Sequence, residues 1–241
     1  LHTDAWPPKD CLHRSLYLGP SASLTFEQVT AADKFVEWTH DPENPVPTIG
    51  GPITSGAPVM EGGAFDQREV AGIFGGNGTG TPLADRPDVM VFQTEPLKQE
   101  VEIIGPVTAT LWVSTSAADT DFTVKLLDVY PPSSELPEGY AMNLTDGILR
   151  LRFRDSFETP KLAESGKRYR IQIVLPPTAN RFATGHRIRI DIASSNFPRF
   201  DVNPNTGAPA GTPSRAVKAQ NRVYWGDHCS SRVEAHFREC P

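Results

Sequence analysis

The stretch Val107-Thr-Ala-Thr-Leu-Trp-Val-Ser114 decides the fold class, because apolar and polar side chains alternate along it. In an extended chain, successive side chains point to opposite faces, so a period of two predicts a β-strand with one face in a core. The face directed at the core comprises Val107, Ala109, Leu111 and Val113. Trp112 lies on the opposite face, together with Thr108 and Thr110.

The same period recurs on both sides of this stretch. We expect further strands at residues 16–18, 34–38, 88–94, 100–104, 122–130, 148–157, 168–175, 187–193 and 232–237, and one that begins at Val223. No amphipathic helix pattern is present, and Pro/Gly clusters separate the strands. An all-β protein is therefore predicted, with a β-sandwich whose long returns between strands favour a jelly roll over an up-and-down barrel.

The alternation also predicts which side chains form the core. In residues 148–157 it directs Leu149, Leu151 and Phe153 inward and the three arginines at 150, 152 and 154 outward. The predicted core is Leu111, Val113, Leu126, Leu151, Ile173, Ile188, Ile190 and Ile192.

Proline and glycine set the organisation of the chain, with 23 Pro and 19 Gly among 241 residues. Both residues are concentrated before the first clear alternation and oppose long regular elements there. We predict an irregular N-terminal segment at residues 1–85 that wraps the main sandwich of residues 86–241, together one domain. The chain begins with Leu and no signal segment follows, which predicts a processed product or an excised piece of something longer.

Composition excludes several classes of protein. The net charge is −6 and the basic residues are scattered, which disfavours binding of nucleic acid. No run of about 18 apolar residues is present, so no membrane partner is expected. The three cysteines, Cys11, Cys229 and Cys240, lie near the chain ends, where one disulfide or three free thiols are both open, with the thiols favoured.

The sequence contains no Gly-x-Ser-x-Gly nucleophile elbow. A triad of Ser195, His186 and Asp191 is tempting. However, His186 shares its parity with Ile188 and Ile190, whereas Asp191 lies on the opposite face of the same predicted strand. We therefore predict no catalytic residue on this chain.

Two groups of residues could suggest a metal. Asp119 and Asp121 lie close together, but calcium needs six to eight oxygen ligands, so we expect a turn paired with an arginine from residues 150–154. His228, Cys229, His236 and Cys240 could chelate zinc, yet they alternate as the end of a strand would. We predict neither a metal site nor a cofactor.

The residues alone leave three functions open: an enzyme domain whose machinery lies elsewhere, a carbohydrate-binding module, and a structural interaction domain. The outward Trp112 suits a sugar-binding face or a docking face equally well.

Several ordered segments resemble the C-terminal domain of the family of X-Pro dipeptidyl-peptidases, cocaine esterases and α-amino-acid ester hydrolases. The resemblance runs from about residue 6 to about residue 232. The segments are Asp-Pro-Glu-Asn-Pro-Val-Pro-Thr-Ile-Gly-Gly at 41–51, Phe-Asp-Gln-Arg at 65–68, Asp-Val-Met-Val-Phe-Gln-Thr-Glu-Pro-Leu at 88–97, Val-Glu-Ile-Ile-Gly-Pro at 101–106, Asp-Thr-Asp-Phe-Thr-Val-Lys-Leu-Leu-Asp-Val at 119–129, Asp-Gly-Ile-Leu-Arg-Leu-Arg-Phe-Arg at 146–154, Gly-His-Arg-Ile-Arg-Ile at 185–190, Ser-Ser-Asn-Phe-Pro-Arg-Phe-Asp at 194–201 and Asn-Pro-Asn-Thr-Gly at 203–207.

This resemblance implies a galactose-binding-domain-like jelly roll that follows an α/β-hydrolase domain in the parent chain. The family's catalytic Ser, Asp and His belong to the hydrolase part, so no catalytic residue carries over. The implied partners are that hydrolase domain and, through it, a small peptide or ester substrate; a homo-oligomer stays open. The implied function is a non-catalytic domain that docks on the hydrolase domain and shapes its substrate pocket, with a carbohydrate-binding module as the alternative.

In the esterase branch, the loop after the Gly pair lines the active-site entrance and carries large apolar residues. Here only Ile53 is bulky, so a roomier or more polar pocket is expected. A second loop, residues 196–200, carries two phenylalanines. They either take part in the docking contact or cap the end of the sandwich. The pocket or docking candidates are Gly50, Gly51, Pro52, Ile53, Thr54, Ser55, Asn196, Phe197, Arg199 and Phe200.

Overall fold

Eleven strands form in the computed structural model, which describes residues 4–209, 211–212 and 214–239. Only three short 3₁₀ turns accompany them, at Pro20–Ala22, Leu83–Asp85 and Leu151–Phe153, so no described helix is long enough to cross a membrane. The strands are β1 Leu12–Leu18, β2 Leu24–Thr25, β3 Lys34–His40, β4 Met90–Gln93, β5 Val101–Thr115, β6 Asp121–Tyr130, β7 Tyr140–Arg150, β8 Tyr169–Phe182, β9 Arg187–Ala193, β10 Ala219–Trp225 and β11 Arg232–Glu239.

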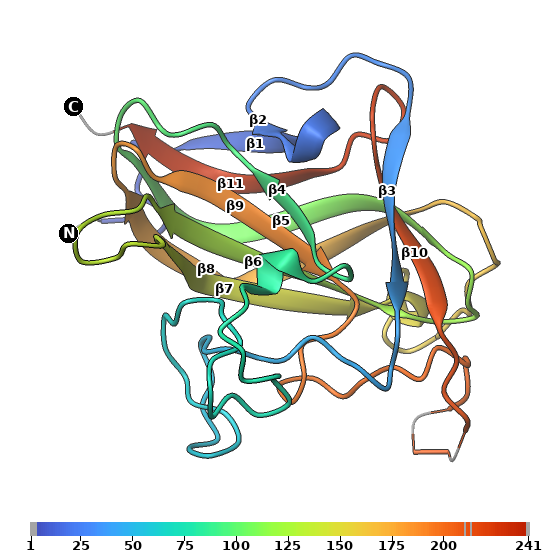
Figure 1. Ribbon diagram of the computed structural model, residues 1–241. Coiled ribbons are helices and arrows are strands. Elements are labelled where there is room, and N and C mark those ends of the chain that lie inside the picture. Colours follow the sequence, from blue (N-terminus) through green and yellow to red (C-terminus); the bar gives the residue numbers. More distant parts are fainter. Residues whose placement is uncertain (1–3, 210, 213, 240–241) are drawn as a thin grey trace.

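The strands pair antiparallel in two sheets that face each other (Figure 1). The larger sheet has the order β2-β1-β11-β5-β10-β3, and β8 pairs with β5 at its side; the smaller has the order β4-β9-β6-β7. Neighbours in each sheet are mostly distant in sequence, as the long returns between strands predicted. The fold is an all-β jelly-roll sandwich of the galactose-binding-like kind.

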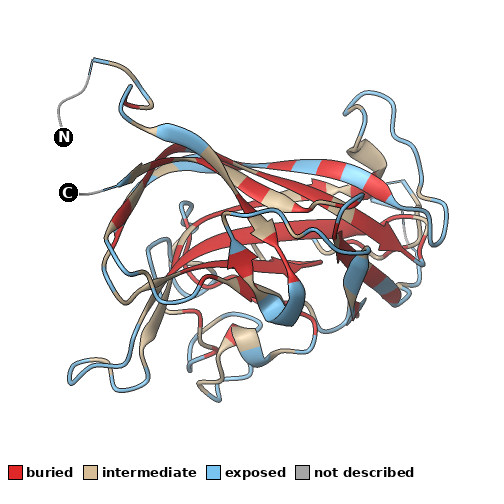
Figure 2. Cartoon of the chain, turned by 90° about the horizontal axis from the view of Figure 1, so that it is seen from above, coloured by how far each residue is buried: buried red, intermediate tan, exposed pale blue. Residues whose placement is uncertain are grey.

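The core lies between the two sheets, where buried residues follow one another along the strands (Figure 2). All eight side chains predicted for the core belong to this cluster. In β9, for example, Ile188, Ile190 and Ile192 are fully buried, because every second residue of the strand faces the larger sheet.

Several predicted strand boundaries are wrong, and three of them lie in β5, β8 and β7. Gly105-Pro106 does not end a strand, because β5 continues through it with a bulge opposite β8. β8 extends past Pro176-Pro177 to Phe182, which is permitted because it pairs with β5 alone. The strand expected at residues 148–157 instead ends at Arg150, and Leu151–Phe153 is a 3₁₀ turn.

The outer face of the smaller sheet is covered by irregular chain from residues 41–89, which Figure 1 shows beneath β6, β9 and β7. A second apolar cluster joins Val46, Ile49, Leu83 and Val89 to Ala193 of β9. Polar residues on the outer face of the smaller sheet are buried beneath the same irregular chain. Lys125 of β6 donates a hydrogen bond of 2.9 Å to the side-chain oxygen of Gln67. The smaller sheet is therefore buried on both faces.

Adjacent residues of β8 test the sandwich directly. Ile173 is 1% exposed in the core, whereas Val174 is 69% exposed on the outer face. We expect Ile173→Ala to lower the free energy of unfolding by about 2–5 kcal/mol, because it leaves a cavity. Val174→Ala should change it by less than about 0.5 kcal/mol. Urea unfolding measures both, and equal losses for the two variants would contradict the assigned faces.

Candidate functional site

The three residues of the tempting triad have other partners. The Ser195 hydroxyl accepts a hydrogen bond of 2.9 Å from the Val46 backbone N–H. Asp191 forms a two-pronged ion pair with Arg189, at 2.6 and 2.7 Å. His186 Nδ1 lies 2.8 Å from a carboxylate oxygen of Asp128, a partner that the sequence analysis did not anticipate. Within the part of the chain that the structure describes, no serine forms a hydrogen bond with the His186 ring.

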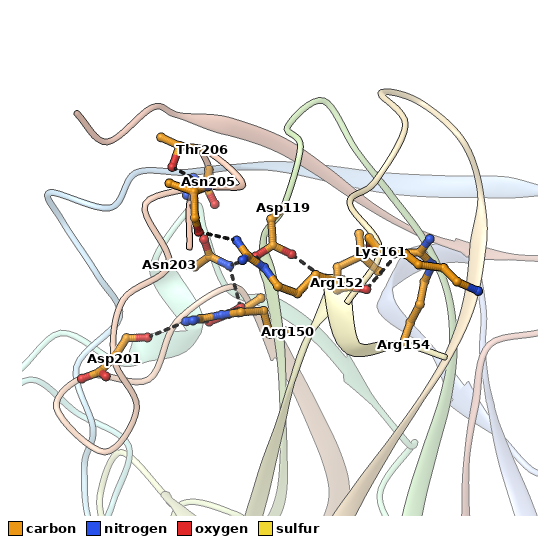
Figure 3. Close-up of polar contacts among 12 residues, drawn as sticks. Asp119, Arg150, Arg152, Arg154, Lys161, Asp201, Asn203, Asn205 and Thr206 are labelled. Carbon is orange, nitrogen blue, oxygen red and sulfur yellow. Dashed lines mark hydrogen bonds and ion pairs between the residues drawn. The ribbon is translucent and has the colours of Figure 1, made fainter. Parts of the chain in front are cut away.

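The acidic turn pairs with arginines, as predicted (Figure 3). Arg152 contacts Asp119 at 2.7 Å, and Arg150 contacts both oxygens of Asp121 at 2.9 and 3.0 Å. The amide of Asn203 donates to both carboxylates. Burial raises the pKa of Asp121, and the hydrogen bond from Arg150 opposes that rise. These oxygens are occupied by protein donors and do not form a cation site.

Among the cysteines and histidines near the chain ends that the structure describes, the rings of His13 and His236 are in contact, with centroids 5.1 Å apart. Cys11 and Cys229 are free thiols. Cys240 lies outside the described residues, and so do the disulfide and the zinc site that the sequence left open for it. Within the described part of the chain, no group of three His, Cys, Asp or Glu side chains could hold a metal ion.

The two loops named as pocket or docking candidates lie side by side. Phe197 donates its backbone N–H to the Val46 carbonyl, and Thr48 donates to the Phe197 carbonyl. Arg199 donates its backbone N–H to the Thr48 hydroxyl at 3.2 Å. Chain segments about 150 residues apart in the sequence thus form one structural unit at the loop-covered side of the smaller sheet.

A buried ion pair anchors this unit. The guanidinium of Arg199 contacts the carboxylate of Asp146 on β7, and both side chains are at least 94% buried. Gly51 crosses directly over the pair with a φ of +106°, and a Cβ there would lie 3.2 Å from the Asp146 carboxylate. A larger residue at position 51 would strain the backbone and crowd the ion pair, which explains the glycine.

Residues 51–63 leave the body of the domain as a hairpin, here called the flap. Gly51 and Gly63 exchange two backbone hydrogen bonds of 2.7 and 2.9 Å at its base. The candidates Pro52, Ile53, Thr54 and Ser55 form its outgoing arm and are exposed, with Ile53 at 53%. All hydrogen bonds of residues 52–62 in the described structure stay within the flap.

A hollow of about 410 Å³ opens beside the flap. Residues 57–61 of the flap line it together with residues 70–74, and Thr48, Gly50 and Phe65 complete the lining. Sequence reasoning missed this hollow, because no periodicity marks residues 57–74. The sequence does show large apolar residues in this segment without a strand pattern, and that was the available signal. In the structure, four of them are each at least 40% exposed: Val59, Phe65, Val70 and Phe74.

The loop 196–201 contacts one wall of this hollow and lines a second, smaller one. Phe197 is half-buried and contacts Phe74, with ring centroids 5.9 Å apart. Phe200, also half-buried, lines a hollow of about 290 Å³ with the stacked rings of Phe153 and Phe157. Asn196 is buried beneath the loop, where its backbone carbonyl accepts from the Phe200 N–H.

The ion pair below Gly51 can be tested against an exposed pair. Arg199→Met would leave the Asp146 carboxylate buried without its cation, and we expect a loss of about 3–5 kcal/mol in the free energy of unfolding. Arg222→Met, which removes a half-exposed pair with Glu37, should cost less than about 1 kcal/mol.

The double variant Arg199→Met with Asp146→Leu should recover most of that loss, because no unpaired charge remains. Urea unfolding of the four proteins measures each step. A cost of Arg199→Met no larger than that of Arg222→Met would show that the buried pair does not anchor the loops.

This chain is similar to known proteins in both sequence and fold. Cocaine esterase of Rhodococcus sp. is 35% identical over 240 residues, which are 95% of this chain and 38% of that protein. An aminopeptidase from the marine sediment archaeon Thaumarchaeota archaeon has a TM-score of 0.84 at 33% identity, over 98% of this chain and 38% of that one. An α-amino acid ester hydrolase has a TM-score of 0.79 at 35% identity, over 93% of this chain and 36% of that one.

The chain thus spans less than two-fifths of the length of these relatives. Residues 1–234 match the family described as the X-Pro dipeptidyl-peptidase C-terminal non-catalytic domain. The segments quoted for the resemblance all lie within this match, and the sandwich is the fold that the resemblance implied. The chain belongs to the family of X-Pro dipeptidyl-peptidase C-terminal non-catalytic domains.

Proposed function

We propose that this chain is the β-sandwich of a serine hydrolase that docks on the α/β-hydrolase domain and completes one wall of its substrate pocket. The observation that carries the proposal is an exposed apolar surface built from loops, here called the docking surface. It begins with residues that are at least 40% exposed: Ile53, Val59, Phe65, Val70 and Phe74.

The docking surface extends beyond the flap. Phe197 joins it through the contact with Phe74, and Phe200 leads on to Phe153 and to Phe157, which is 80% exposed. Soluble monomers rarely expose contiguous apolar patches of this kind, and such patches mark interaction sites. The hydrophobic contact of a covering domain accounts for aromatic side chains on loops that the sandwich core does not use.

The position of the flap supports a role at the substrate pocket. The family resemblance implies that the loop after the Gly pair, which is the outgoing arm of the flap, lines the active-site entrance, and ligand pockets often form where domains meet. The relatives are named for ester and peptide cleavage, so the substrate reached through the hydrolase domain is a small ester or peptide. Because Ile53 alone is bulky among residues 52–56, we expect a pocket wall that is roomier or more polar.

The comparisons do not favour a carbohydrate-binding module. Trp112, the aromatic residue that suggested one, is half-buried in a cross-strand row with Tyr224 and Phe35 on the outer face of the larger sheet. Tyr224 is itself buried, and its hydroxyl hydrogen-bonds to Ser114. The row of Trp112, Tyr224 and Phe35 therefore packs as part of the sheet surface.

Docking can be measured with the hydrolase domain of the parent protein expressed separately. We expect this chain to bind it, and Phe74→Ser or Phe157→Ser to weaken binding at least about tenfold, since buried aromatic anchors dominate interfaces. Val174→Ser, an equally apolar but remote exposed site, should leave the dissociation constant unchanged. Calorimetric titration gives the constants; equal effects at all three positions would sink the proposal.

Hydrolysis assays provide a second test, of whether catalysis resides on the hydrolase domain and not on this chain. We expect this chain alone not to cleave p-nitrophenyl esters or X-Pro anilides, because Ser195 and His186 are committed to other partners. Addition of the hydrolase domain should produce activity that Ser195→Ala does not reduce. Turnover by the chain alone that disappears in Ser195→Ala would place a nucleophile on the sandwich and contradict the non-catalytic role.

A further inference from the structure

Two histidines from opposite ends of the chain meet on the outer face of the larger sheet. His13 of β1 and His236 of β11 lie directly opposite each other in the antiparallel pairing of these strands, which Figure 1 shows side by side. Leu16 and Phe237, at alternate positions, belong to the core, so both imidazoles project away from it. Their ring centroids are 5.1 Å apart. The fold thus brings together two nitrogen ligands that the sequence keeps far apart.

No protein group in the described structure occupies these two rings. Neither imidazole forms a hydrogen bond within residues 4–209, 211–212 and 214–239, and Nδ1 of His236 is buried without a partner. The ring of His186, by contrast, is held by the Asp128 carboxylate. Because a buried nitrogen without a partner is costly, the histidine pair is an incomplete polar site.

The surroundings of His236 favour its neutral form. Gly105 of β5 has a φ of +126°, and a Cβ there would lie 2.6 Å from Pro7 and 3.6 Å from Nδ1 of His236. Pro7 of the N-terminal segment therefore lies beside the ring. Burial and the neighbouring His13 lower the pKa of His236, so this imidazole is neutral at neutral pH. A neutral imidazole has a lone pair that can bind a metal ion.

The pair matches the ligand preference of divalent transition metals. Imidazole suits copper, nickel and zinc, whereas magnesium and calcium take oxygen ligands. Zinc–nitrogen bonds of about 2.0–2.1 Å place two bound nitrogens about 3 Å apart, which rotation of these neighbouring rings can reach. Within the described residues, no third His, Cys, Asp or Glu completes the set. Two carboxylates of the same face are paired with arginine instead, Glu234 with Arg232 and Glu102 with Arg238.

We propose that His13 and His236 together bind a divalent ion of the nickel, copper and zinc group, with water in its remaining positions. The ion would link β1, the first strand of the chain, to β11, the last. Since the two ligands meet only when these strands are paired, the ion stabilises the folded chain by mass action. The outer face of the larger sheet is remote from the flap, which stands over the smaller sheet. The site is therefore tested on this chain alone and holds or fails independently of docking.

The experiment titrates the chain with Ni²⁺ and with Mg²⁺, which prefers oxygen ligands. Ni²⁺ is chosen because, unlike Cu²⁺, it does not oxidise the free thiol of Cys11. His2 lies outside the described residues, so every protein, the reference chain included, carries His2→Gln. Calorimetry should show one saturable Ni²⁺ site and no binding of Mg²⁺. Saturating Ni²⁺ should also raise the urea midpoint of unfolding.

Three variants separate the histidine pair from other Ni²⁺ ligands. His13→Gln and His236→Gln should each weaken Ni²⁺ binding at least about tenfold and remove the shift of the urea midpoint, because a single imidazole cannot chelate. His228→Gln, at an exposed histidine in the loop before β11, is the matched control and should change neither. His13 is itself exposed, so its replacement tests the site even where His236→Gln lowers stability.

Three results would overturn the proposal. The first is an unchanged Ni²⁺ affinity in His13→Gln or in His236→Gln, which would leave a single ligand. The second is Mg²⁺ binding as tight as that of Ni²⁺, which would point to carboxylates. The third is Ni²⁺ binding that leaves the urea midpoint of the reference chain unchanged, which would show an adventitious ion only.

Discussion

Burial of the smaller sheet on both faces is the constraint on which the rest of the structure depends. The inner face packs against the larger sheet through aliphatic residues, but the outer face carries Lys125, Arg189 and Asp191, all buried. Burial lowers the pKa of the Lys125 ammonium, and Asp146 and Asp191 oppose that shift. Arg189 and Asp191 satisfy each other within β9, whereas Lys125 takes its hydrogen-bond partner, Gln67, from the N-terminal loops, since buried polar groups without partners are costly.

Those partners fix where the loops lie. Gln67 accepts from Lys125 and donates to the Ile49 carbonyl, so one side chain links the sheet to the loop before the flap. The ion pair of Asp146 with Arg199 lies directly under Gly51 and supports the base of the flap. Through these directional bonds, the base of the flap is positioned by the sheet, while the flap itself stays free. The exposed apolar residues are thereby presented at a defined place.

The sequence predicted the parts of the fold in which one face is apolar. β9 was predicted at its observed limits, because its three isoleucines alternate with charged residues. The first half of β7 was missed, since Asn143, Thr145 and Asp146 read as a polar loop although the covering segments bury them. The arginine partners of the acidic turn followed from charge and spacing. The hollow could not be predicted, because residues 57–74 have no period and their contacts are set by tertiary structure.

A polar layer under the loops suits a domain that presents loops to a partner. Apolar residues of similar volume would often support equal stability in place of buried ion pairs. Apolar packing is non-directional, however, and would allow the covering segments to slide over the sheet. The pair of Arg199 with Asp146 and the hydrogen bond from Lys125 to Gln67 each link the smaller sheet to a covering segment, and their geometry is directional. We infer that this layer is retained for the geometry of the docking surface, which would otherwise vary from one molecule to the next.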